Sequence, residues 1–155
     1  MIKRFDVTLE KNDDYKDRST IYGSDVLDMF NAIPWNEERK EYFKSEEEFG
    51  SCLSVRYKDS NNLEFSFEVE LYFDDENKDE TLPLKYSLSY CYQEIKIEKA
   101  FLGLFGEKEK IIDESIFMDD QNMDFTLKCL NAFLRHDYEF LKNNMYENFG
   151  PDLKE

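Results

Sequence analysis

The segment from Ser51 to Phe73, SCLSVRYKDSNNLEFSFEVELYF, limits the fold more than any other part of the chain. Apolar and polar residues alternate over 53–58 and again over 63–73, and the intervening DSNN at 59–62 favours a turn. A period of two is that of a strand with one buried face, so the segment predicts a β-hairpin. One face of the hairpin enters a core, and the other carries an acidic stripe of Glu64, Glu68 and Glu70.

The N-terminal fifty residues predict one strand followed by two helices. Alternation over residues 2–9 indicates the strand, and the polar residues 11–20 are interpreted as a connection. Ser24 or Asp25 can cap the first helix, which Pro34 ends or kinks. The second helix runs from Trp35 to a stop at Gly50. Its charged residues have the helical spacing of an exposed face: Glu37, Glu38 and Glu41 with Arg39, Lys40 and Lys44.

Residues 84–97 and 107–118 predict two further strands. In the first, Ile95 and Ile97 fall on the parity opposite to that of the preceding tyrosines. This change of parity predicts a bulge or break near Gln93–Glu94.

A helix is expected to close the chain, starting at Asp119 or Asp120 as its cap. Asp137 can cap a second segment, which would split the helix near Arg135–His136. Its apolar stripe consists of Leu127, Leu130, Leu134, Tyr138, Leu141 and Met145.

This element order predicts the α+β class: a single antiparallel meander sheet with N-terminal helices and a long C-terminal helix packed on one face. The 155 residues fit one domain, 1–155, in which residues 146–155 are expected to form a frayed tail.

The charge balance limits the classes of partner. Twenty basic residues against 36 acidic ones give a formal net charge of −16, spread over the whole chain. Such a chain repels nucleic acid and anionic membranes, because phosphate binding needs lysine and arginine. It attracts basic proteins, and the alternative is that the charge serves solubility alone.

Cys52, Cys91 and Cys129 show no metal-binding spacing and are interpreted as reduced core residues. With no signal peptide and no apolar run of membrane-spanning length, the sequence predicts a cytoplasmic protein.

Motifs for chemistry are lacking. His136 is the only histidine, and adjacent helical residues such as His136 and Asp137 do not face each other. The carboxylate-rich segments that start at Asp75 and Asp120 lack the glycine and the final glutamate of a calcium loop. No catalytic residue, metal or cofactor is therefore expected, and His136 is interpreted as a surface or helix-junction residue.

The candidate site is an acidic partner-binding surface that combines the hairpin stripe with the loop after it, YFDDENKDETLPL. Its predicted members are Glu64, Glu68, Glu70, Tyr72, Asp74, Asp75, Glu76, Asp79 and Glu80. Tyrosine is common in protein interfaces, so three residues remain open between core and interface: Tyr86, Tyr90 and Tyr92.

A small, acidic, single-domain α+β chain of this kind is similar to the immunity proteins that bacteria pair with polymorphic or contact-delivered toxins. The resemblance implies a protein that inhibits a cognate basic toxin, such as a nuclease, by occluding its active or substrate-binding site. Two alternatives stay open: a small-ligand-binding or hydrolytic enzyme domain that uses buried carboxylates, and an oligomeric structural module paired through the apolar stripe of the last helix. A monomer is slightly favoured.

Overall fold

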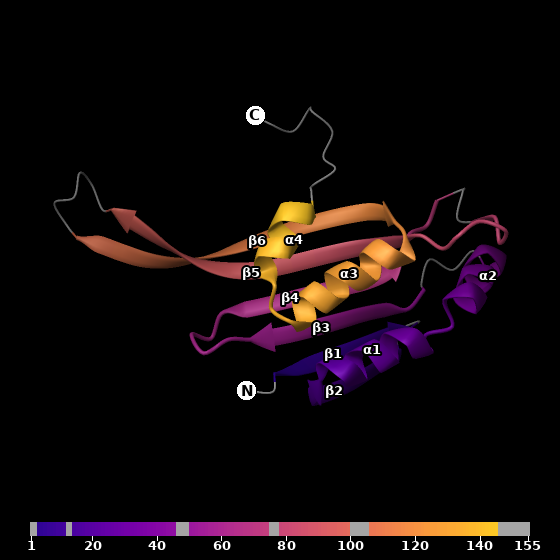
Figure 1. Ribbon diagram of the computed structural model, residues 1–155, viewed down its shortest axis with the longest axis horizontal. Helices are drawn as coiled ribbons and strands as arrows, with labels where there is room; N and C mark the ends of the chain where they lie inside the picture. The colour runs from indigo at the N-terminus through magenta and orange to yellow at the C-terminus, as the bar shows by residue number, and fades with distance from the viewer. Residues whose placement is uncertain (1–2, 12–13, 46–49, 75–77, 100–105, 146–155) are drawn as a thin grey trace, which may run out of the picture.

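The computed structural model describes residues 3–11, 14–45, 50–74, 78–99 and 106–145. These residues form a six-stranded antiparallel sheet with strand order β2-β1-β3-β4-β5-β6 (Figure 1). The strands are β1 Arg4–Lys11, β2 Asp14–Tyr22, β3 Cys52–Lys58, β4 Glu64–Leu71, β5 Tyr86–Lys99 and β6 Glu107–Gln121.

Four helices accompany the sheet: α1 Gly23–Ala32, α2 Trp35–Ser45, α3 Met123–Leu134 and α4 Tyr138–Asn144. The α+β class and the antiparallel sheet are confirmed. The expectation of N-terminal helices is wrong, because two strands precede α1. Among the described residues, none of the helices has the length and apolar character of a membrane span.

Strand β2 replaces the polar connection predicted for residues 11–20, and that prediction is wrong. β2 is an edge strand that pairs only with β1, and nearly all of its side chains are exposed. A strand with solvent on both faces has no reason to alternate, so the alternation on which the prediction depended is missing.

The predicted hairpin is confirmed as β3 and β4, which pair from Cys52–Glu70 to Lys58–Glu64. Asp59 closes the turn, because its carboxylate accepts hydrogen bonds from the backbone N–H groups of Asn61 and Leu63.

Pro34 separates α1 from α2, as the sequence predicts. The exposed charged face predicted for α2 is wrong at two positions, since Glu38 and Arg39 are both buried. Glu38 accepts hydrogen bonds from the backbone N–H and the hydroxyl of Ser51.

The C-terminal helix is split as predicted, and Asp137 caps α4 by accepting from the Phe140 N–H. The predicted cap of the first segment is wrong: Asn122, and neither Asp119 nor Asp120, accepts from the Phe125 N–H at 2.8 Å.

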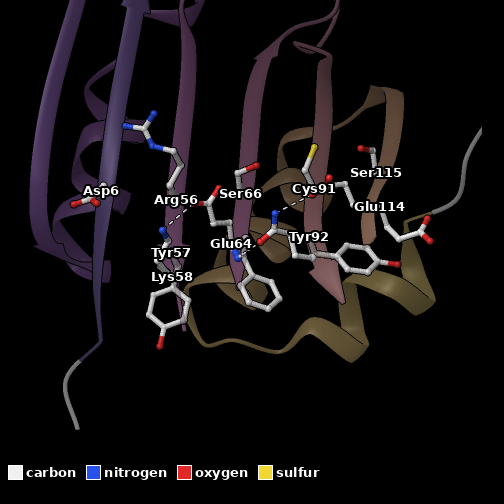
Figure 2. Close-up of a pocket in the computed structure, with 13 residues that line it drawn as sticks. Asp6, Arg56, Tyr57, Lys58, Glu64, Ser66, Cys91, Tyr92, Glu114 and Ser115 are labelled. Atoms are coloured by element: carbon white, nitrogen blue, oxygen red, sulfur yellow. Dashed lines mark hydrogen bonds and ion pairs between the residues drawn. The ribbon is translucent and has the colours of Figure 1, made fainter. Parts of the chain in front are cut away.

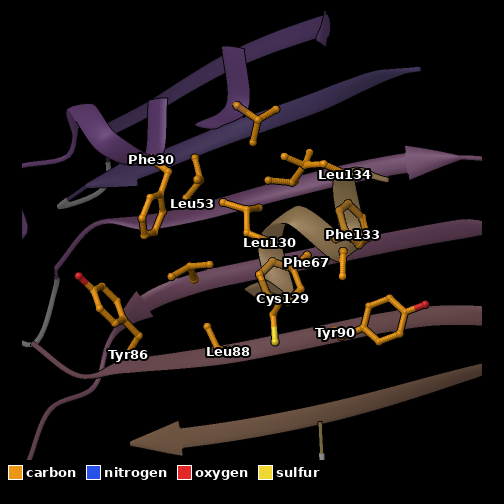
Figure 3. Close-up of a cluster of buried hydrophobic side chains, with 14 of the residues drawn as sticks. Phe30, Leu53, Phe67, Tyr86, Leu88, Tyr90, Cys129, Leu130, Phe133 and Leu134 are labelled. Atoms are coloured by element: carbon orange, nitrogen blue, oxygen red, sulfur yellow. The ribbon is translucent and has the colours of Figure 1, made fainter. Parts of the chain in front are cut away.

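The core lies between the sheet and the helices, where aromatic and aliphatic side chains of both layers meet (Figure 3). Most of the stripe of the last helices is buried there, so it packs inside the chain: Leu130, Leu134, Leu141 and Met145. The predicted tail 146–155 lies outside the described residues.

Neither a bulge nor a break occurs at Gln93–Glu94, so that prediction is wrong. β5 and β6 stay in register from Leu88–Met118 to Lys99–Glu107, and the register shifts instead between Tyr86 and Leu88. Asp120 has a positive φ of 61° on the β6 side of this irregularity. Ile95 and Ile97 therefore keep their parity and remain exposed.

Candidate partner-binding face

Each strand of the sheet presents one face to the helices and one away from them. On β4, Phe67, Val69 and Leu71 are buried under the helices, whereas the alternate residues point to the other side. We call this second side the open face. In Figure 2 the side chains of Arg56, Ser66 and Cys91 project from it.

Carboxylates dominate the open face. Those assigned to it by strand register and hydrogen bonding are Asp6, Glu10, Asp17, Glu64, Glu68, Glu70, Glu107, Glu109, Asp113 and Asp119. The basic residues on the same face are Arg4, Arg56 and Lys58, and Lys99 lies on the same side near the end of β5.

The most acidic part of the open face is a row that crosses four strands. Glu10 of β1 is paired with Cys52 of β3, which is paired with Glu70 of β4 and, through it, with Ser87 of β5. The Ser87 hydroxyl donates a hydrogen bond to Asp119 at 2.7 Å, which adds a third carboxylate at the β6 end.

A second row lies directly beside the first. Thr8 is paired with Ser54 and Ser54 with Glu68, whose carboxylate accepts a hydrogen bond from the Ser54 hydroxyl at 3.1 Å. We call these two rows together the acidic rows. Within the described residues, no lysine or arginine forms an ion pair with Glu10, Glu68 or Glu70.

The crowding of like charges changes the pKa values of ionisable groups in the acidic rows. Partial burial raises the pKa of Glu70, and the neighbouring charges of Glu68, Asp119 and Glu10 raise it further. Burial, followed by the charges of Glu68, Glu70 and Glu10, raises the pKa of the Cys52 thiol to about 12. The acidic rows therefore favour an added positive charge, and Cys52 stays a thiol at neutral pH.

Next to the acidic rows the open face has a hollow of about 410 Å³ with a floor of small side chains, Ser66, Cys91 and Ser115 (Figure 2). Its charged rim is largely paired. Lys58 contacts Glu64 at 2.9 Å, and the Gln93 amide donates to Asp113 at 2.9 Å. The charged groups of the rim already have partners, and they would have to give up these contacts to bind a ligand. The hollow therefore favours an added charge less than the acidic rows do.

The predicted site residues do not all lie together. Glu64, Glu68 and Glu70 share the open face, as expected, but Glu64 is at the far end of β4 in an ion pair with Lys58. Tyr72 and Asp74 follow β4 and are half-buried.

The described part of the acidic loop is fixed against α2. The buried Arg39 guanidinium donates to the backbone carbonyls of Asp79, Glu80 and Leu82, and Lys40 forms an ion pair with Glu80. Hydrogen bonds from Thr81 lower the pKa of Asp79. The predicted members Asp75 and Glu76 lie outside the described residues.

Of the three tyrosines that the sequence leaves undecided between core and interface, two are core residues. Tyr86 and Tyr90 are fully buried (Figure 3). Tyr92 is half-buried, with the Lys142 ammonium 4.3 Å from its ring centroid. His136 is confirmed at the α3–α4 junction, where desolvation and the nearby Lys3 lower its pKa to about 4.

Two carboxylates of the acidic rows, Glu10 and Asp119, are not predicted by the sequence. Glu10 has the polar parity of the first strand, but only the nonlocal pairing of β1 with β3 brings it beside Cys52. Asp119 reaches Ser87 at the register shift of β6, which no local pattern marks.

The cysteines are free, but only Cys129 is a buried core residue. Cys52 and Cys91 are half-buried on the open face, so the prediction of three core cysteines is wrong for these two. Among the described residues, no group of three or more histidine, cysteine, aspartate or glutamate side chains is placed to hold a metal ion.

No family model, curated protein or solved structure matches this chain.

Proposed function

We propose that this chain is a binding protein that captures a basic protein partner on the open face of its sheet. The observation that carries the proposal is the pair of acidic rows, in which Glu10, Glu68 and Glu70 lie close together without a basic partner among the described residues. A lysine or arginine from a partner would relieve this repulsion and form charge-assisted hydrogen bonds.

We further propose that the partner is a toxin and that the chain acts as its immunity protein in the cytoplasm. A broad face built on a regular sheet suits the occlusion of an active or substrate-binding site, because a sheet holds its side chains in fixed positions. The net charge of −16 supports fast capture of a basic enzyme.

The test is coexpression with the protein encoded beside this chain in its genome, if that product is basic. We expect the wild-type chain to relieve growth inhibition by this product and to bind it with an affinity that falls as salt is added. The double variant Glu68→Lys/Glu70→Lys should lose both effects.

A matched control changes the net charge equally on the helix side. Asp28 of α1 and Glu139 of α4 are exposed, so Asp28→Lys/Glu139→Lys adds the same charge far from the open face. If the control variant loses binding as completely as the open-face variant, net charge alone governs the association and the proposed face is wrong.

A second candidate function is the binding of a small polar ligand in the hollow, as part of a ligand-binding or hydrolytic domain. The observation that favours it is the hollow of about 410 Å³ with Arg56 and Lys58 on its rim. Glu70, whose pKa is raised, does not line this hollow, so the carboxylate most suited to acid–base chemistry is in the neighbouring row. Thermal-shift screening with anionic metabolites, compared between wild type and Arg56→Ala, tests this candidate.

A further inference from the structure

The β5–β6 pair extends beyond the rest of the sheet. β4 pairs with β5 only as far as Phe65–Tyr92, whereas β5 and β6 continue in register to Lys99–Glu107. Residues 93–99 and 107–113 thus form a two-stranded ribbon, which projects from the sheet in Figure 1.

One face of this ribbon carries three exposed isoleucines. Ile95 and Ile111 are directly paired, Ile97 follows on the same face opposite Glu109, and the exposed fractions of Ile95, Ile111 and Ile97 are 43%, 56% and 59%. We call these three residues the isoleucine face. A cluster of three large apolar side chains on a projecting ribbon differs from the scattered exposed residues that are normal for a protein surface.

The opposite face of the ribbon is mostly charged, with the half-buried Ile112 as its apolar residue, and its charged groups form ion pairs. Glu94 forms an ion pair with Lys142 of α4, Lys96 with Glu114, and Glu98 with Lys110. The apolar residues therefore point away from the core side, and a bulge that would have turned them toward it is absent. These three isoleucines do not contribute to the hydrophobic core of the described residues.

The isoleucine face is continuous with the open face. The pair Ile95–Ile111 directly follows the pair Gln93–Asp113 at the edge of the hollow. Phe117, paired with Ser89 next to Glu68, is half exposed on the same side. A partner bound to the acidic rows would thus have apolar side chains of this chain within the same surface.

We propose that the isoleucine face is the apolar anchor for the basic protein partner, which would present aliphatic or aromatic side chains bordered by lysine and arginine. This inference rests on the proposed function. Charge complementarity selects this occupant over a second copy of the chain, because two copies would each bring a net charge of −16 and their acidic rows to the same contact.

The two parts of the surface have different effects on binding. Exposed carboxylates mainly raise the association rate and make it depend on salt. Buried apolar contacts at the ribbon mainly lower the dissociation rate, since most affinity differences within one interface arise there.

The test uses two synthetic peptides of equal length and charge, one alternating lysine with valine and one alternating lysine with serine. Fluorescence anisotropy measures their affinities for the full chain and for the triple variant Ile95→Thr/Ile97→Thr/Ile111→Thr. Threonine retains β-branching, so the ribbon is expected to fold, which circular dichroism and Trp35 fluorescence verify. The matched control is Leu82→Thr, an exposed apolar residue in the loop held by Arg39.

We expect the wild type to bind the lysine–valine peptide about tenfold or more tightly than the lysine–serine peptide, as burial of one or two aliphatic side chains would give. The triple variant should lose this preference through faster dissociation, and Leu82→Thr should keep it. In the wild type, the methyl resonances of Ile95, Ile97 and Ile111 should shift with the lysine–valine peptide, and that of the buried Ile33 should not.

Equal, salt-sensitive binding of both peptides to the wild type would overturn the inference and leave the proposed function in place. A triple variant that still prefers the lysine–valine peptide would do the same. If neither peptide binds even at low salt, the acidic rows do not recognise basic chains, and both the proposed function and the inference fail.

Discussion

Glu38 and Arg39 are consecutive charged residues of α2, and both leave solvent to bind backbone groups from distant parts of the chain. Glu38 accepts from Ser51, and Arg39 donates to carbonyls of the loop at 79–82. Their spacing from other charges is the same whether the helix face is exposed or covered. The sequence therefore could not show that this face is partly buried.

The buried Glu38 carboxylate should be important for stability. In Glu38→Ala the N–H and hydroxyl of Ser51 lose their acceptor, which should lower the free energy of unfolding by about 1–3 kcal/mol. Urea titration followed by the fluorescence of Trp35, the single tryptophan, measures the change. Glu37→Ala, at a neighbouring exposed position, should change it by less than about 0.5 kcal/mol.

His136 should make stability depend on pH below neutrality. Its pKa is about 4 in the folded chain against an ordinary value of 6.5, because its ring is desolvated among Phe5, Tyr57 and Tyr138 and faces the charge of Lys3. Between these two values the unfolded chain binds a proton that the folded chain does not. The contribution of His136 to stability is therefore present above about pH 6.5 and is lost as the pH falls toward 4.

The variant His136→Asn isolates this effect, since asparagine tolerates the positive φ of 60° at this position. At pH 7.5 the wild type should be more stable than the variant because of the ring contacts of His136. The difference between their free energies of unfolding should narrow as the pH falls from 6.5 to 4.5. Urea titrations of both proteins at several pH values measure the difference. Parallel pH profiles would contradict the assignment.

At the scale of elements, the sequence predicts what local periodicity controls. The β3–β4 hairpin, the break at Pro34 and the α3–α4 split each follow from alternation, a proline or a cap. β2 was missed because an edge strand carries no buried face. The change of parity at Ile95 and Ile97 predicts a bulge or break, whereas β5 continues in register with β6 and the ribbon leaves both side chains exposed.

The candidate site shows the same limit. The parity of β4 predicts that Glu68 and Glu70 share a face, but their neighbours depend on the strand order. Glu10 joins them only because β1 lies between β2 and β3. The loop residue Glu80 was included because it is near in sequence, yet its contacts are with α2.

The start of α3 offers a prediction at this scale. Asn122→Ala removes the side-chain acceptor for the Phe125 N–H, which should lower the free energy of unfolding by about 0.5–2 kcal/mol. Thermal and urea unfolding measure the loss. The same substitution at the exposed turn residue Asn61 should have little effect, and equal losses at both positions would show that Asn122 does not act as a cap.

At the scale of the whole molecule, helices cover one side of the sheet and leave carboxylates gathered on the other. The acidic rows cost stability, because they hold the carboxylates of Glu10, Glu68 and Glu70 near one another without an ion pair to a lysine or arginine of the described residues. Residues kept for binding often have such a cost, and their replacement commonly stabilises a protein at the expense of function.

Glu70→Gln should therefore stabilise the isolated chain while weakening the capture of a basic partner. Burial, together with Glu68, Asp119 and Glu10, raises the pKa of Glu70 above its ordinary 4.5. The folded chain thus holds this proton more tightly than the unfolded chain, and the stability that Glu70 contributes at low pH is lost as the pH rises through the raised value. A neutral glutamine avoids this loss. The free energy of unfolding of Glu70→Gln should therefore exceed that of the wild type by roughly 0.2–1 kcal/mol at pH 7, and the difference should vanish near pH 4.

Salt separates the two causes of the raised pKa. The part of the gain that comes from repulsion should shrink on addition of about 0.5 M NaCl, and the part that comes from desolvation should remain. Glu64→Gln is the matched control on the same strand and face, because it breaks the ion pair with Lys58 and should give no gain. Urea unfolding at two salt concentrations measures both variants, and a gain from Glu64→Gln equal to that from Glu70→Gln would mean that overall charge, and not the acidic rows, limits the stability of the fold.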